Sequence, residues 1–73
     1  MNNVKKMVVS YDHPSNYLPE DLDWLFDNEV FLNMNSIEYV APFTYLKTNP
    51  FTEMYCIVLR ERVLYSLKNP LEV

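Results

Sequence analysis

Apolar and polar residues alternate near the start of the chain. In VKKMVVSY, residues 4–11, Met7, Val9 and Tyr11 share one face. A period of two is typical of a half-buried strand, so we predict a β-strand here. The stretch DHPSNYLP, residues 12–19, has two prolines and several turn-forming residues and predicts a loop.

The segment PEDLDWLFDN then changes to a helical period. Pro19 suits the first position of a helix, because the N–H that proline lacks would be unpaired there. Glu20 and Asp21 follow in the first turn, where the helix dipole favours negative charge. We therefore predict a helix from Pro19 to Asn28, and a short extended segment in the EVFLNMNS that follows it.

Alternation returns in IEYVAPFTYL, where every second residue from Ile37 to Tyr45 shares one face. Pro42 lies on the other face and lacks an N–H, which predicts an edge strand or a bulge. The turn KTNPF and the β-rich TEMYCIVLR come next. We predict that these two strands form a hairpin with a loop of about four to five residues.

The stretch RERVLYSLK, residues 60–68, fits two structures. Val63, Tyr65 and Leu67 alternate as in a strand, whereas Leu64 and the helix formers before the Asn-Pro dipeptide favour a helix. Because RER holds no turn-forming residue, we expect one extended element or a helix here, and no second tight hairpin.

Length and composition limit the fold. The 73 residues allow one hydrophobic core. We predict a single domain, residues 1–73, of the α+β class: one amphipathic helix packed on a small antiparallel β-sheet of three or four strands. The only cysteine, Cys56, lies in an apolar run and suits a small buried hydrophobic residue, and a lone cysteine excludes an internal disulfide. Glycine is absent, which excludes phosphate-binding loops of the P-loop or dinucleotide type.

Charge and hydropathy limit the kinds of partner that the chain can bind. The net charge is −4, which argues against direct binding to nucleic-acid phosphates. The N-terminal apolar run is too short for a signal peptide, and no run approaches the ~20 apolar residues of a membrane helix. We expect a cytoplasmic protein that binds neither membrane nor nucleic acid.

Candidate catalytic groups are few. His13 is the only histidine, and Asp12, Ser10 and Ser15 lie close to it in the sequence. Residues so close together cannot easily form the chain of hydrogen bonds of a catalytic triad. One histidine and one cysteine also make a metal site improbable. We expect no enzymatic activity, no cofactor, no metal and no small-molecule substrate.

The single tryptophan lies in the most acidic segment, where five acids fall within ten residues. On a helical wheel Leu22, Leu25 and Phe26 form the core stripe, and Trp24 points almost opposite. Glu20 and Asp27 lie beside Trp24 at helical spacing, and one further turn would add Phe31. Trp24 is then either packed under the neighbouring loop, against Tyr17, or an aromatic anchor ringed by acids at a protein interface.

The candidate partner-binding surface unites the charged and aromatic residues of the predicted helix with the two arginines. Its members are Glu20, Asp23, Trp24, Asp27, Phe31, Arg60 and Arg62. Acid–base catalysis would need one of these carboxylates desolvated in a pocket. We therefore interpret them as a solvated face that steers a basic partner.

The whole chain, and the segment VVSYDHPSNYLPEDLDWLF in particular, resembles small phage-encoded regulators of bacterial RNA polymerase, of the kind made by a Xanthomonas lytic phage. The resemblance implies a protein that binds the amino-terminal end of the polymerase β′ subunit near the RNA exit channel. It implies inhibition of transcription initiation through the σ-containing holoenzyme, and reduced termination. Two other functions stay open: a nucleic-acid mimic that inhibits a host DNA-binding enzyme, and a small self-associating structural module.

Overall fold

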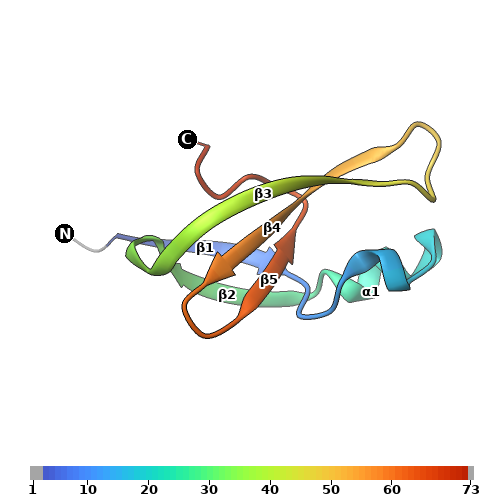
Figure 1. Ribbon diagram of the computed structural model, residues 1–73. Coiled ribbons are helices and arrows are strands. Elements are labelled where there is room, and N and C mark those ends of the chain that lie inside the picture. The colour runs from blue at the N-terminus through green and yellow to red at the C-terminus, as the bar shows by residue number, and fades with distance from the viewer. Residues whose placement is uncertain (1–2, 73) are drawn as a thin grey trace.

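The computed structural model describes residues 3–72 and contains two antiparallel sheets with a short helical segment (Figure 1). The strands are β1 Val4–Val9, β2 Asn28–Asn33, β3 Ile37–Tyr45, β4 Thr52–Leu59 and β5 Val63–Ser66. β1 pairs with β2, and the second sheet has the order β3-β4-β5. The α+β prediction is confirmed, with five strands divided between two sheets rather than three or four in one.

The first predicted strand is confirmed over Val4–Val9. It pairs with β2 so that Met7 lies opposite Val30, which also confirms the extended segment expected after the helix. Met7 and Val9 are buried as the alternation predicts, whereas Tyr11 lies beyond the strand and is exposed. The chain then makes a 3₁₀ turn at Met34–Ser36 before β3.

The helix is shorter than the predicted range, Pro19–Asn28. A 3₁₀ turn at Pro19–Asp21 leads into α1, Leu22–Leu25. Phe26 leaves the helix with φ −93° and ψ 59°. The β-branched and aromatic residues that follow pair with β1 instead, so tertiary pairing outweighs the local helical pattern.

The predicted hairpin forms between β3 and β4, with a loop of six residues, 46–51. β3 is an edge strand with Pro42 exposed along it, and its register shifts between Ile37 and Tyr39. The edge position agrees with the prediction from Pro42. The register shift lies nearer the start of β3, and the pairing at Pro42 itself is regular, with Tyr55 opposite it.

Residues 63–66 form a strand, β5, and the expectation that no second tight hairpin follows is wrong. β5 pairs antiparallel with β4 across a turn at residues 60–62, where the Leu59 N–H donates to the Arg62 carbonyl at 2.9 Å. Backbone pairing closes this turn without glycine, and no residue in the described range has positive φ. Leu64 and Ser66, rather than Val63, point into the core.

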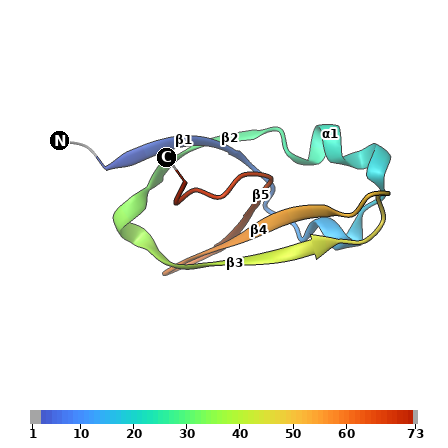
Figure 2. The ribbon, with the colours of Figure 1, turned by 90° about the horizontal axis from the view of Figure 1, so that it is seen from above.

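The buried hydrophobic residues form two clusters, one between the two sheets and one beneath α1. The first joins both sheets through Met7, Val9, Leu32, Ile57, Leu59 and Leu64. The second lies beneath α1 and consists of Leu25, Phe26, Tyr45 and Met54. The molecule is elongated and measures 40 × 24 × 20 Å along its principal axes. Figures 1 and 2 show α1 and the β4–β5 turn at opposite ends.

Cys56 lies in β4 and is half-buried rather than fully buried, and burial raises the pKa of its thiol. Over residues 3–72, no helix has the length and apolar character needed to cross a membrane.

Candidate protein-binding surface

Trp24 is exposed because α1 buries its other face. Leu25 and Phe26 are buried in the cluster beneath the helix, and Leu22 packs against it. The predicted core stripe is therefore confirmed. Trp24 points away from it and keeps 57% of its surface exposed. Tryptophan is highly buried on average, so such exposure is unusual. Exposed apolar patches mark interaction sites.

The indole of Trp24 is nevertheless held in one orientation. Its Nε1–H donates to Asp21 Oδ1 at 3.3 Å, and Asp21 Oδ2 accepts the Leu18 N–H at 3.0 Å. Tyr17 meets the indole edge to face, with ring centroids 5.5 Å apart at 87°. The packing interpretation is therefore confirmed in part, because Trp24 packs on Tyr17, while more than half of its surface still faces solvent. The interpretation as an interface anchor stays a prediction.

Tyr17 ties this site to the sheet. Its hydroxyl donates to Asp12 Oδ2 at 2.9 Å, and its carbonyl accepts the Tyr45 hydroxyl at 2.8 Å. The hydrogen bond to Asp12 is the main cause that raises the pKa of Tyr17, with burial and the charges of Asp12 and Asp21 adding to it. Burial, followed by the charges of Asp21 and Glu20, raises the pKa of Tyr45. Tyr17, on which Trp24 packs, is therefore held through both its hydroxyl and its carbonyl.

The acids around Trp24 are uncompensated. Glu20, Asp23 and Asp27 are all exposed. Within residues 3–72 the one ion pair joins Lys6 to Glu29, at 3.4 Å, so none of these three carboxylates is paired there. All three are solvated, as predicted, but α1 ends at Leu25, so helical spacing does not place Asp27 beside Trp24.

Further apolar residues gather at the same end of the molecule. The Lys47 ammonium donates to the carbonyls of Ser15 and Tyr17, at 2.7 and 3.2 Å, and holds the β3–β4 loop beside the helical segment. Leu46 and Phe51 in that loop are each 65% exposed. We call this region, residues 14–27 with loop 46–51, the helical end.

The sequence predicts the packing of Tyr17 on Trp24, which the structure confirms. It does not predict the roles of three other residues of the helical end. Asp21 is expected only in the first turn of the helix, Leu46 at the end of a strand and Phe51 in the hairpin turn. The sequence signals the turn through Asn-Pro, but not that the turn lies against the helical segment.

Phe31, Arg60 and Arg62 do not join Trp24. Because the helix ends at Leu25, Phe31 lies on β2 and is 72% exposed. It lines a groove of about 510 Å³ together with the arginines of the β4–β5 turn. The Arg62 guanidinium lies 5.9 Å from the centre of the Tyr11 ring, within cation–π range. We call Phe31 with residues 60–62 the arginine end, and the predicted seven-residue surface is in fact divided between the two ends.

The candidate triad residues make other contacts. His13 Nδ1 accepts the Ser15 N–H at 3.1 Å, and its ring packs against both Phe43 and Tyr65, with ring centroids 5.0 and 4.9 Å away. The Ser10 hydroxyl donates to the Asp12 carbonyl at 2.8 Å. Among residues 3–72 no three His, Cys, Asp or Glu side chains are grouped as metal ligands.

The chain matches no family model, no curated protein sequence and no solved structure.

Proposed function

We propose that this protein is a non-enzymatic, cytoplasmic binder of bacterial RNA polymerase that acts through the helical end. The observation that carries the proposal is Trp24, which is exposed and held by Asp21 and Tyr17, with exposed, unpaired carboxylates before and after it in the chain. A rigid aromatic anchor with a charged rim is the usual composition of an energetically dominant interface patch. The negative rim favours a basic partner surface.

The resemblance to phage regulators supplies the choice of partner. The expected contact is the amino-terminal end of the β′ subunit near the RNA exit channel. Binding there inhibits transcription initiation by the σ-containing holoenzyme and reduces termination. Phe31, Arg60 and Arg62 lie at the other end of the molecule and form a second, separate candidate contact.

The test uses purified bacterial holoenzyme and the tagged protein. We expect recovery of polymerase subunits, direct binding to an amino-terminal β′ fragment, and fewer initiated transcripts from a σ-dependent promoter. The matched control is the double variant Trp24→Ala, Asp27→Lys, which should lose both binding and inhibition. Equal recovery by the control variant, or binding without any change in transcript yield, would overturn the proposal.

Self-association through β3 is the weaker alternative. β3 has a free edge, and edges of this kind pair with other chains. Pro42 interrupts the hydrogen-bonding groups along that strand, which opposes such pairing. A monomeric mass in sedimentation would exclude this alternative. A nucleic-acid mimic would instead bind a basic groove with steep salt dependence and little dependence on Trp24.

A further inference from the structure

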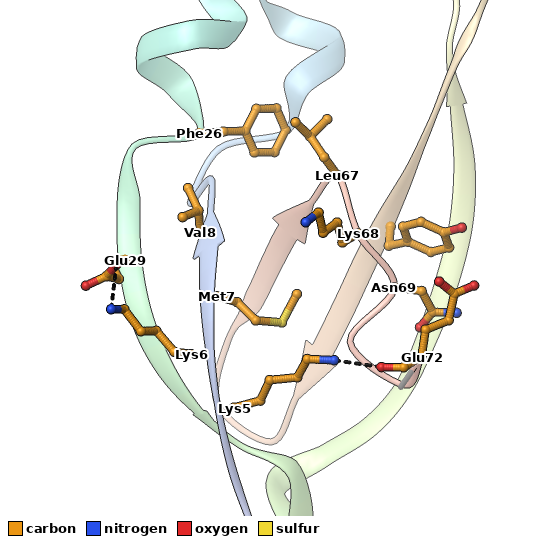
Figure 3. Close-up of a pocket in the computed structure, with 11 residues that line it drawn as sticks. Lys5, Lys6, Met7, Val8, Phe26, Glu29, Leu67, Lys68, Asn69 and Glu72 are labelled. Carbon is orange, nitrogen blue, oxygen red and sulfur yellow. Dashed lines mark hydrogen bonds and ion pairs between the residues drawn. The ribbon is translucent and has the colours of Figure 1, made fainter.

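A groove of about 780 Å³ runs between β1 and the chain that follows β5 (Figure 3). Its apolar lining includes Met7, Phe26 and Leu67, and three of the four lysines of the chain also line it. The volume lies in the range typical of ligand sites. The groove is separate from the surface around Trp24.

The groove exists because β5 pairs with β1 at one point only. Ser10 and Tyr65 exchange backbone hydrogen bonds of 2.8 and 2.9 Å. Immediately afterwards the Ser66 hydroxyl donates to the Lys68 carbonyl at 2.6 Å and turns the chain away. The pairing between β5 and β1 therefore stops at this bridge. The edge of β1 at the residues before Ser10 lies open along the groove.

Backbone alternation shows which groups this edge offers. The N–H and C=O of Ser10 face β5, so those of Val8 and Lys6, two and four residues earlier, point to the same side. Both residues line the groove. Within residues 3–72 the only strand partner on that side of β1 is the Ser10–Tyr65 bridge. An unpaired strand edge is a template for an added strand.

The groove carries an excess of positive charge, because three lysines and two glutamates, Glu29 and Glu72, line it. The Lys5 ammonium crosses the groove to the backbone carbonyls of Pro70 and Glu72, at 3.1 and 2.7 Å. Figure 3 shows the hydrogen bond to Glu72. Lys68 points toward β1 from the opposite wall. Neither lysine forms an ion pair with any described residue, whereas Lys6 pairs with Glu29 at the rim. A carboxylate between Lys5 and Lys68 would gain two charge-assisted hydrogen bonds.

We propose that this groove binds a short, extended, acidic segment of another protein as an added strand on β1. The backbone of the segment bonds to Lys6 and Val8, and its carboxylate bonds to Lys5 and Lys68 in exchange for the carbonyls that Lys5 now contacts. An aliphatic side chain of the segment packs on Met7. This site goes beyond the proposed polymerase contact, because it uses none of the residues around Trp24.

The probe is a capped, valine- and threonine-rich peptide of about seven residues, long enough to span β1, with two glutamates two positions apart. We expect saturable binding that slows amide hydrogen exchange of Lys6 and Val8 by about tenfold or more at saturation. The amide of Met7, which faces β2, should not change. The same residues should show the largest amide shifts in nuclear magnetic resonance spectra.

Two peptide controls leave the protein untouched. Replacing both glutamates by glutamine should weaken binding by about tenfold, the expected cost of losing charge-assisted hydrogen bonds. Methylating the backbone nitrogens on one edge of the peptide should abolish binding, whereas methylating those on the other edge should not. Equal binding by both methylated peptides would overturn strand addition.

Two protein variants complete the test. Lys68→Glu should weaken peptide binding by about tenfold, while Arg60→Glu, the same charge change at the arginine end, should not. Trp24→Ala should bind the peptide normally, which separates this site from the polymerase contact. Slow exchange at Lys6 and Val8 without peptide would overturn the proposal in favour of the chain's own C-terminal segment. Slow exchange that depends on protein concentration would overturn it in favour of a second copy.

Discussion

Trp24 and Phe31 are both exposed aromatic side chains, yet their surroundings differ in charge and in constraint. At the helical end Trp24 is hydrogen-bonded to Asp21 and packed against Tyr17, and its neighbours are acids. At the arginine end Phe31 is 72% exposed and shares a groove with Arg60 and Arg62. A side chain that is already ordered loses less entropy on binding, so exposure alone does not rank two candidate anchors. By this comparison Trp24 is the stronger one.

The largest effect should come from the cluster beneath the helical end. Leu25→Ala removes a buried side chain that supports α1, and we expect it to lower the free energy of unfolding by about 2–5 kcal/mol. Because Leu25 adjoins Trp24 in the helix, the near-ultraviolet circular dichroism of the indole should weaken as well. Thermal unfolding and circular dichroism would check this. An unchanged indole signal would show that α1 does not hold Trp24 in place.

Trp24→Ala should produce the next largest effect, and on binding rather than on folding. Truncation of a central interface anchor costs about 2 kcal/mol of affinity or more. The loss of stability should stay well below the ~3–5 kcal/mol of a buried tryptophan, because more than half of this side chain is exposed. Calorimetric unfolding and titration against the polymerase fragment measure the two quantities on one sample.

Phe31→Ala is the matched control at the arginine end. It removes a more exposed aromatic side chain, and we expect little change in stability or in affinity for that fragment. If Phe31→Ala weakens binding as much as Trp24→Ala does, the comparison between the two ends fails. If Trp24→Ala unfolds the domain near room temperature, Trp24 belongs to the core.

Much of the helical end was predictable, because it depends on local spacing. The burial of Leu25 and Phe26 and the exposure of Trp24 follow from a period of 3.6 residues over a single turn. The arginine end was not predictable, because Phe31 of β2 shares a groove with the arginines of the β4–β5 turn only once the two sheets have packed together. The turn at residues 60–62 has no sequence signal of its own and is held by the pairing of β4 with β5. The two buried serines, Ser10 and Ser66, likewise satisfy their hydroxyls with carbonyls two residues on, a contact that no alternation pattern reports.

A smaller effect should follow from reversing one charge at each end. Asp27→Lys should slow association with a basic partner by a factor of a few and lessen its salt dependence, because rim charges act mainly on the encounter. Arg60→Glu, at the other end, should leave the salt dependence at low ionic strength much less affected. Stopped-flow association rates at several salt concentrations would show the difference. Equal slowing by both variants would mean that net charge, rather than the helical end, governs the encounter.

The smallest effect concerns tyrosine titration. Folding raises the pKa of Tyr17, chiefly through Asp12, and that of Tyr45, chiefly through burial, above the ordinary value of 10.0. As the pH rises past that value, the unfolded chain releases these protons before the folded chain does, so stability is full below it and declines above it. Asp12→Asn should bring the pKa of Tyr17 back toward its ordinary value and leave that of Tyr45 nearly unchanged. Nuclear magnetic resonance titration of labelled tyrosines would resolve the two.

The single bridge between Ser10 and Tyr65 also has a consequence for how the chain can be divided. Strands β1 and β2 come from one contiguous half of the sequence, and β3, β4 and β5 come from the other, with the turn at Met34–Ser36 between them. A cut in that turn breaks no strand pairing, yet neither piece keeps the cluster that Met7, Val9 and Leu32 share with Ile57 and Leu64. A two-stranded hairpin is at best marginally stable alone. Each fragment should therefore fold only when it associates with the other. The chain could then be divided into two fragments that report the proximity of the proteins to which they are fused.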